Sequence, residues 1–323
     1  MNFSILKSTD PYLNLAIEEY LLKNSEEEYF LLWQNEPTVV IGKNQNAFAE
    51  INFDYINEYG IHVARRITGG GAVYHDLGNL NYSYISKKQD NDINFERFAK
   101  PVIDALCDMG IPATLSGRND ILVEGKKISG NAQTHFGNRT LHHGTLLFDV
   151  EMDSLSSALK VDSKKIESKA IKSVRSRVAN IKSYLKENIS ITDFANLIKT
   201  MIIDKYSAAE IDIKITDSIN KLAERNASDA WLYPDRDYVS RFSLNKKERF
   251  DFGTVSVFLN MKNNVITEIK IAGDFFSSSA ITHLENLISG VSVSNLEERI
   301  SNIKVSDYIF GMSNSDFLKM IKT

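Results

Sequence analysis

RRITGGGAVYHDLGN, at residues 65–79, is the most informative stretch of the sequence. Three consecutive glycines follow an expected strand at 61–66 that ends in two arginines. Glycine lets the backbone adopt positive φ and approach a ligand closely, and successive N–H groups in such a loop can bind an anion. The arginines add positive charge suited to carboxylate or phosphate. We therefore expect an anion-binding loop, and the alternative is a glycine-rich hairpin without a ligand.

Two common phosphate-binding motifs do not account for this loop. The sequence contains no GxxxxGK[ST], which excludes a P-loop. The glycine spacing differs from GxGxxG and no helix-forming run follows, which excludes the dinucleotide-binding fingerprint.

A second segment, GRNDILVEGKKISGNA at 117–132, carries further chemistry. Asp120 stands just before an expected strand, where a carboxylate can hold Mg²⁺ bound to a nucleotide. Lys127 heads a run of small and polar residues and can present a point charge to a buried anion. The alternative for Lys127 is a solvated lysine of a hairpin.

Two more segments complete the set of candidates. His142 and His143 are adjacent on an expected strand and should face opposite ways, so they are poor ligands for one metal. No HExxH or similar metal spacing occurs. KSVRSR, at 172–177, suits an anion-contacting loop, and its alternatives are a surface loop or a weak RNA contact.

The rest of the chain alternates strands with helices, which predicts an α+β fold with a mixed sheet. We expect strands at 29–34, 38–42, 61–66, 80–85, 120–124 and 144–150, a polar loop before the last of these, and helices at 10–23, 94–109 and 190–205. Residues 151–172 are rich in lysine, and we expect them to be helical.

The C-terminal part changes character. FGTVSVFLNMKNNVITEIKIAGDF, at 252–275, predicts a hairpin that turns at Asn263-Asn264 and is followed by helices. We expect a first domain at 1–247 and a small α/β accessory domain at 248–323. Residues 206–247 look irregular and polar, like a connector, so we expect the C-terminal domain to move relative to the first.

Composition limits the classes of protein. The 323 residues are 43% hydrophobic and 25% charged, which excludes general disorder. The net charge of −4 argues against a nonspecific nucleic-acid or membrane binder. The single cysteine, Cys107, excludes an intrachain disulfide and is expected to be buried and inert. Without a signal peptide or an apolar run of membrane-spanning length, we expect a cytoplasmic protein.

These segments, in this order, resemble the lipoate–protein ligase family. The resemblance runs from about residue 10 to 182, and the C-terminal unit is similar to the accessory domain of long members. The matching pieces are WQNEPTVVIGKNQN at 33–46, RRITGGGAVYHDLGN at 65–79, GRNDI at 117–121, KISGNA at 127–132, HHGTLL at 142–147 and KSVRSRVANI at 172–181.

The resemblance implies a catalytic domain of the biotin/lipoate protein ligase type and a reaction in two steps. Lipoate, or octanoate, and ATP with Mg²⁺ give lipoyl-AMP and pyrophosphate. A lysine of an acceptor then takes the lipoyl group. The acceptors implied are the lipoyl domains of 2-oxoacid dehydrogenase complexes, the H protein of glycine cleavage, or both. No contact with nucleic acid or membrane is implied.

Site residues carry over by motif. Lys127 is the implied catalytic residue and contacts both the lipoate carboxyl and the α-phosphate. Asp120 is the candidate Mg²⁺ ligand. Thr68, Gly69 and Gly70 line the lipoate site with Lys127. The residues implied to bind ATP and the adenylate are Arg66, Gly71, Ala72, Val73, Tyr74, Lys127, Ser173, Arg175 and Arg177.

The sequence departs from the family pattern at two positions, and rival functions stay open. Thr68 and Asn131 stand where relatives often carry serine, and neither change removes a charge. An ATP-independent lipoyl or octanoyl transferase of the same fold would need a cysteine or lysine nucleophile, and Cys107 is badly placed for it. Biotin ligation and a binding module without catalysis are further alternatives.

Overall fold

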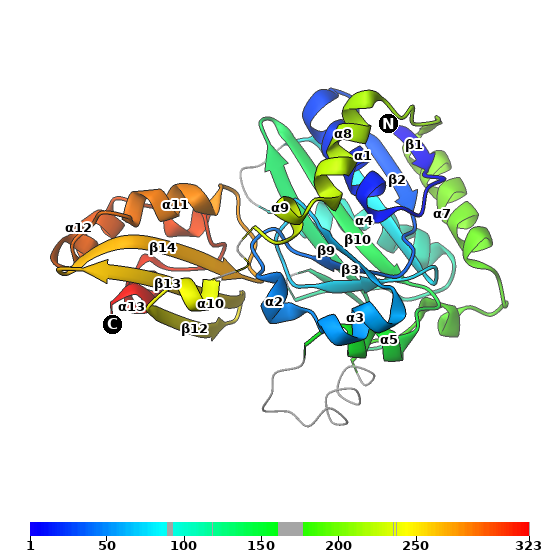
Figure 1. The fold of residues 1–323 in the computed structure, drawn as a ribbon. Helices are drawn as coiled ribbons and strands as arrows, with labels where there is room; N and C mark the ends of the chain where they lie inside the picture. Colours follow the sequence, from blue (N-terminus) through cyan, green and yellow to red (C-terminus); the bar gives the residue numbers. More distant parts are fainter. Residues whose placement is uncertain (89–92, 118, 161–176, 235, 237, 323) are drawn as a thin grey trace.

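The computed structural model describes residues 1–88, 93–117, 119–160, 177–234, 236 and 238–322. Ser173 and Arg175 lie outside these residues, as does most of the expected lysine-rich helix. Its described beginning is helix α5 (Met152–Ala158). Figure 1 shows a large N-terminal domain and a smaller C-terminal lobe beside it.

A large mixed sheet forms the centre of the N-terminal domain. Its strands are β1 (Asn2–Ile5), β2 (Tyr29–Trp33), β6 (Asn79–Lys87), β7 (Thr114–Ser116), β8 (Asp120–Val123), β9 (Lys126–Phe136), β10 (Arg139–Leu147) and β11 (Ala209–Glu210). They lie in the order β11-β1-β2-β6-β10-β9-β8-β7. Strand β1 is parallel to β2 and β11, and the other neighbours are antiparallel.

A smaller sheet lies against one face of the large one (Figure 1). It consists of β3 (Thr38–Ile41) between a parallel β4 (His62–Arg65) and an antiparallel β5 (Val73–His75). The glycine-rich segment is the connection from β4 to β5. The mixed sheets confirm the expected α+β class.

Helices cover both faces of the large sheet (Figure 1). The helices of this domain include α1 (Pro11–Asn24), α2 (Ala47–Glu50), α3 (Phe53–Tyr59), α4 (Phe95–Asp108), α7 (Ile191–Tyr206), α8 (Asp217–Ala227) and α9 (Asp229–Leu232). Helix α1 begins as expected, because the Asp10 side chain accepts hydrogen bonds from Tyr12 N and Leu13 N. Helix α4 ends at Asp108, and Gly110 follows two residues later with a φ of 81°, which suits glycine.

The C-terminal lobe has a sheet of its own. Its elements are α10 (Tyr238–Arg241), β12 (Leu244–Phe250), β13 (Gly253–Lys262), β14 (Val265–Gly273), α11 (Ile281–Ile288), α12 (Leu296–Ser301) and α13 (Asn314–Ile321). The hairpin of β13 and β14 turns at Asn263 and Asn264, both at positive φ, as expected. The domain division at 247/248 stays a prediction, and β12 crosses it.

Three expectations were wrong. The segment before β10, which we expected to be a polar loop, is the long strand β9. The prediction failed because buried polar residues of β9, such as Ser129 and Asn131, resemble loop residues in the sequence. The supposed connector from residue 206 contains α8 and α9, and α8 packs on α1. Cys107 is exposed on α4. A single residue at the boundary of a helical face is easily assigned to the wrong side.

Candidate functional site

A pocket opens between the two sheets of the N-terminal domain. Its cavity volume is about 120 Å³. Its lining comes from the glycine segment, α1 and strands of both sheets, and consists of Leu15, Trp33, Val40, Arg66, Gly70, Gly71, Ala72, Val73, His75, Asn81, Asn119, Lys127, Gly130, Asn131, Ala132, His143, Gly144 and Thr145.

Strand register explains the floor of this pocket. Asn81 of β6 is paired with Trp33 of β2 on one side and with Thr145 of β10 on the other. Thr145 Oγ1 in turn accepts a hydrogen bond from Gly130 N of β9 (3.3 Å). Directly paired residues share a face of the sheet. The floor is therefore one row that runs across four neighbouring strands toward Lys127.

Arg66 holds the glycine loop in shape. Its guanidinium donates to Thr68 Oγ1 (2.9 Å) and to the carbonyls of Gly69 (2.8 Å), Gly71 (2.7 Å) and Val40 (3.0 Å). Burial lowers the pKa of Arg66 to about 10, so the group stays cationic at neutral pH. Arg66 thus brings a positive charge to the pocket wall while its donors fix the loop backbone.

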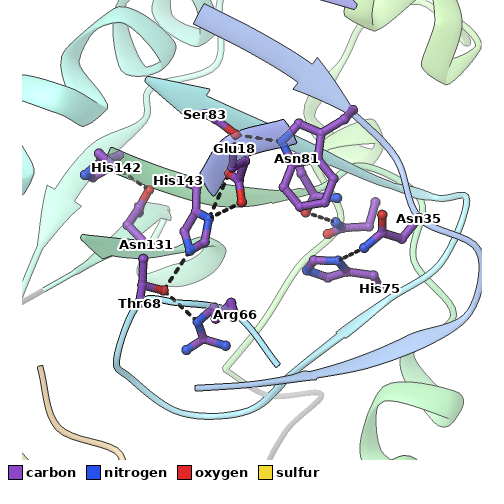
Figure 2. Close-up of polar contacts among 12 residues, drawn as sticks. Glu18, Asn35, Arg66, Thr68, His75, Asn81, Ser83, Asn131, His142 and His143 are labelled. Carbon is purple, nitrogen blue, oxygen red and sulfur yellow. Dashed lines mark hydrogen bonds and ion pairs between the residues drawn. The ribbon is translucent and has the colours of Figure 1, made fainter. Parts of the chain in front are cut away.

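Figure 2 shows a buried polar network behind this loop. Thr68 Oγ1 lies 2.8 Å from His143 Nε2, and His143 Nδ1 lies 2.9 Å from Glu18 Oε1. Ser83 Oγ donates to the same carboxylate (2.5 Å) and accepts from Trp33 Nε1 (2.7 Å). Buried networks with satisfied partners rigidify a site. This one connects α1, the large sheet and the glycine loop.

Sequence reasoning missed Glu18, which anchors that network. The carboxylate is 1% exposed although Glu18 lies in the apolar stretch of α1. An acidic residue at a buried helical position needs a partner inside the protein. The position of Glu18 within the apolar stretch LNLAIEEY could have indicated a buried carboxylate. The partner of that carboxylate could not be identified without the fold.

Lys127 stands at the mouth of the pocket. Its Nζ lies 2.8 Å from Asp120 Oδ1, and each side chain is about one-third exposed, at 35% and 36%. The backbone of Lys127 is held on both sides, because its N–H donates to Arg177 O (2.8 Å) and its carbonyl accepts from Ala179 N (2.9 Å). The end of the KSVRSR segment is therefore attached directly to the lysine.

The described site residues that the sequence predicted differ in how they relate to the pocket, and Gly69, Asp120 and Arg177 are not part of its lining. Arg66, Lys127 and the run from Gly70 to Val73 line the pocket. Thr68 does not line the pocket but contacts His143, which does. The Tyr74 side chain packs in a neighbouring core cluster, so any contact of Tyr74 with a nucleotide would involve its backbone.

Gly69 and Gly70 also contact the C-terminal lobe. Gly70 N donates to Phe275 O (3.2 Å), and a side chain at position 69 would collide with the same carbonyl. The Phe276 ring is fully buried, beside Phe95 of α4 (5.2 Å between centroids). The glycine loop is thus both a wall of the pocket and a docking point between domains.

His142 and His143 face opposite sides, as expected. His142 stacks on Phe98 (5.6 Å between centroids), and burial lowers its pKa to about 3. Among the described residues, no three His, Cys, Asp or Glu side chains form a cluster that could hold a metal ion. None of the described helices is long and apolar enough to cross a membrane.

Two family descriptions match the chain. Residues 10–203 match "Lipoyl protein ligase A/B catalytic domain", and residues 240–321 match "Bacterial lipoate protein ligase C-terminus". The lipoate-protein ligase LplJ of Bacillus subtilis is 45% identical over 292 residues, which cover 87% of each chain.

Two similar solved structures carry ligands of the expected kind. One is P. falciparum LipL1 in complex with lipoate, with a TM-score of 0.80 and 26% identity over 98% of this chain and 97% of that one. The other is lipoate-protein ligase A bound with ATP, with a TM-score of 0.62 and 28% identity over 72% and 99%. With both of its parts matched, the chain belongs to the lipoate–protein ligase family, a family of ATP-dependent enzymes, in the form that carries a C-terminal domain.

Proposed function

We propose that this protein activates lipoate with ATP and transfers the lipoyl group to a lysine of an acceptor protein. The observation that supports this most is the position of Lys127, whose ammonium group stands at the mouth of a pocket with apolar inner walls from Leu15, Trp33 and Val40. Such a pocket suits a fatty acid whose carboxylate remains near the mouth.

In the first step, a carboxylate oxygen of lipoate attacks the α-phosphorus of ATP. The bond from this phosphorus to the bridging oxygen breaks, and pyrophosphate leaves. Both reactants are anions, so the site must stabilise concentrated negative charge. Lys127 would exchange Asp120 for the oxygens of the carboxylate and the α-phosphate. It would thereby hold the reactants together, while Arg66 adds positive charge beside Gly71 to Val73.

In the second step, the acceptor amine attacks the acyl carbon, AMP leaves, and solvent takes the amine proton. The lipoyl domains of 2-oxoacid dehydrogenase complexes and the H protein of glycine cleavage are the acceptors we propose, on the family resemblance. Ser173, Arg175 and Arg177 stay proposed adenylate contacts, and a cytoplasmic location stays a prediction.

Asp120 fits a role in binding Mg²⁺. One carboxylate at the pocket mouth, about one-third exposed, suits an ion that keeps several waters and takes its other ligands from phosphates. Bound there, Mg²⁺ would neutralise part of the triphosphate charge.

The first prediction concerns Lys127. We expect Lys127→Ala to abolish pyrophosphate release from lipoate and ATP, because it removes the ammonium group at the pocket mouth that would hold the carboxylate and the α-phosphate together. Lys126→Ala is the matched control, since Lys126 is the exposed neighbour on β9, and it should keep near-normal activity. Circular dichroism would verify that both variants fold.

Near-normal activity of Lys127→Ala would overturn the assignment. The same assay separates the rival functions. An ATP-independent acyltransferase would transfer the acyl group without releasing pyrophosphate, and a biotin ligase would respond to biotin instead of lipoate.

A further inference from the structure

The inner end of the pocket contains a buried histidine that the proposed reaction does not use. His75 of β5 is 3% exposed and lines the pocket. Its ring lies beside Trp33, 6.0 Å away between centroids. The ring therefore faces the part of the pocket where an acyl chain would end.

Hydrogen bonds fix which nitrogen of His75 carries the proton. Asn14 Nδ2 donates to the carbonyls of Ser8 (3.0 Å) and Gln34 (2.9 Å), which sets the orientation of that amide. Asn35 Oδ1, 3.0 Å from the same nitrogen, must then be an acceptor. Asn35 Nδ2 consequently donates to His75 Nδ1 (3.1 Å; Figure 2).

His75 Nδ1 is thus an acceptor, and the proton of a neutral ring sits on Nε2. The ring is neutral because burial lowers its pKa to about 3, with a further contribution from the charge of Arg66. Nε2–H has no hydrogen-bond partner within the described part of the chain. In Figure 2 this side of the ring points toward the space in front of Arg66 and His143.

Asn81 adds a second polar group at the same place. It is 1% exposed, and its amide bonds with Asn79 (2.7 Å) through one of its two polar atoms. The other atom has no partner among the described residues. A buried polar group without a partner is destabilising, so two of them in one pocket indicate a ligand that supplies partners.

The distance from Lys127 matches the far end of a medium-length acid. Strands lie about 4.8 Å apart, so the row from β9 to β6 spans roughly 10 Å, and the row to Trp33 on β2 spans roughly 14 Å. A carboxylate held at Lys127 would therefore place the end of an eight-carbon chain near Asn81 and His75. In lipoate that end is a dithiolane ring, and sulfur is a weak acceptor.

We propose that His75 Nε2–H, with Asn81 beside it, binds the sulfur end of the acyl chain and makes the pocket prefer lipoate over octanoate. Octanoate has the same chain length without an acceptor, so it would leave the donor unpaired. A site built to hydrogen-bond one substrate discriminates against an analogue that lacks the partner. This inference rests on the proposed function and assigns its substrate preference.

The test compares kcat/KM for lipoate and octanoate, measured by pyrophosphate release. His75→Phe should lower kcat/KM for lipoate about 5- to 20-fold and leave octanoate unchanged or improved. His75→Gln, which keeps an amide donor, should retain part of the preference. His135→Phe is the matched control, because His135 Nε2 also lacks a partner but lies outside the pocket lining.

The possible failures are distinguishable. Wild-type protein that releases no pyrophosphate with either acid would overturn the proposed function and this inference with it. An active wild type whose ratio of the two kcat/KM values is unchanged by His75→Phe would overturn the inference alone. If the phenylalanine variant does not fold, Asn81→Leu provides the same comparison and should also lower the ratio.

Discussion

At the scale of single residues, the buried histidines illustrate how environment decides chemistry. His142 lies between aromatic rings, with Nε2 3.2 Å from Asn131 Oδ1. Burial, with the charge of His143 as a smaller cause, lowers the pKa of His142 to about 3. His143, one residue later, lies against the Glu18 carboxylate on the opposite face.

The low pKa of His142 predicts a pH dependence of stability. Below about pH 6.5 the unfolded chain protonates this ring, whereas the folded protein does so only near pH 3. The free energy of unfolding therefore falls as the pH falls through this window, by about 1.4 kcal/mol per pH unit for each such group. His142→Phe should lose about 2 kcal/mol less than wild type between pH 7 and pH 5.

Urea unfolding of both proteins at the two pH values measures this difference. Equal losses in the two proteins would show that His142 is not buried in its neutral form.

Some residues of the site could be predicted from the sequence and others could not. The glycine triplet, Lys127 and Asp120 stood out because their residue types suit anion chemistry. Glu18 and His75 did not, because their roles depend on partners far away in sequence, such as the contact of His143 with Glu18 across 125 positions. The predicted nucleotide contacts themselves remain predictions.

At the scale of elements, helix α8 shows how a segment that seemed irregular is ordered. Arg225 of α8 reaches Glu19 of α1 through two nitrogens (2.5 and 3.0 Å), and Lys23 pairs with the same carboxylate (2.6 Å). Burial alone would raise the pKa of Glu19, but the bonds from Arg225 and Lys23 lower it. The Arg225 guanidinium also lies 4.1 Å from the Trp231 ring centre.

We expect Arg225→Ala to destabilise the protein by about 2–3 kcal/mol, because it leaves the 1%-exposed Glu19 carboxylate with one partner. Lys23→Ala is the control and should cost less than about 1 kcal/mol, since the bidentate pair remains. Thermal unfolding of the two variants compares them, and equal effects would contradict the ranking.

Helices α4 and α7 could be predicted from their apolar period, and α1 from the Asp10 cap that precedes Pro11. Strand β9 could not, because Asn131 and Gln133 are polar and yet 3% and 1% exposed. Alternation of apolar and polar residues reveals a strand only where one face meets water. Buried polar residues such as these therefore remove the alternating pattern by which strand β9 could have been predicted.

At the scale of the whole molecule, the two domains meet at the glycine loop. Gly70 N–H donates to Phe275 O (3.2 Å), and Gly273 N–H donates to Asn44 O (2.8 Å). An anion bound by the loop would compete for the N–H of Gly70. Such an anion would couple ligand binding to domain docking through one backbone group.

We accordingly expect lipoate with ATP to change the small-angle scattering of the protein, as the C-terminal lobe moves relative to the N-terminal domain. Phe276→Ala, which removes the buried ring beside Phe95, should increase the radius of gyration without any ligand. Identical scattering curves with and without ligand would count against the motion.

The close approach of Phe275 to Gly69 also bears on how this family can evolve. In a chain whose lobe docks here, the side chain of an alanine at position 69 would collide with the Phe275 carbonyl of the lobe. This restriction does not depend on the substrate in the pocket. A relative that lost the lobe would be released from that restriction and could vary at this codon. Variation at the first glycine of the triplet would then indicate the loss of the C-terminal lobe, and it could occur without any change in the reaction.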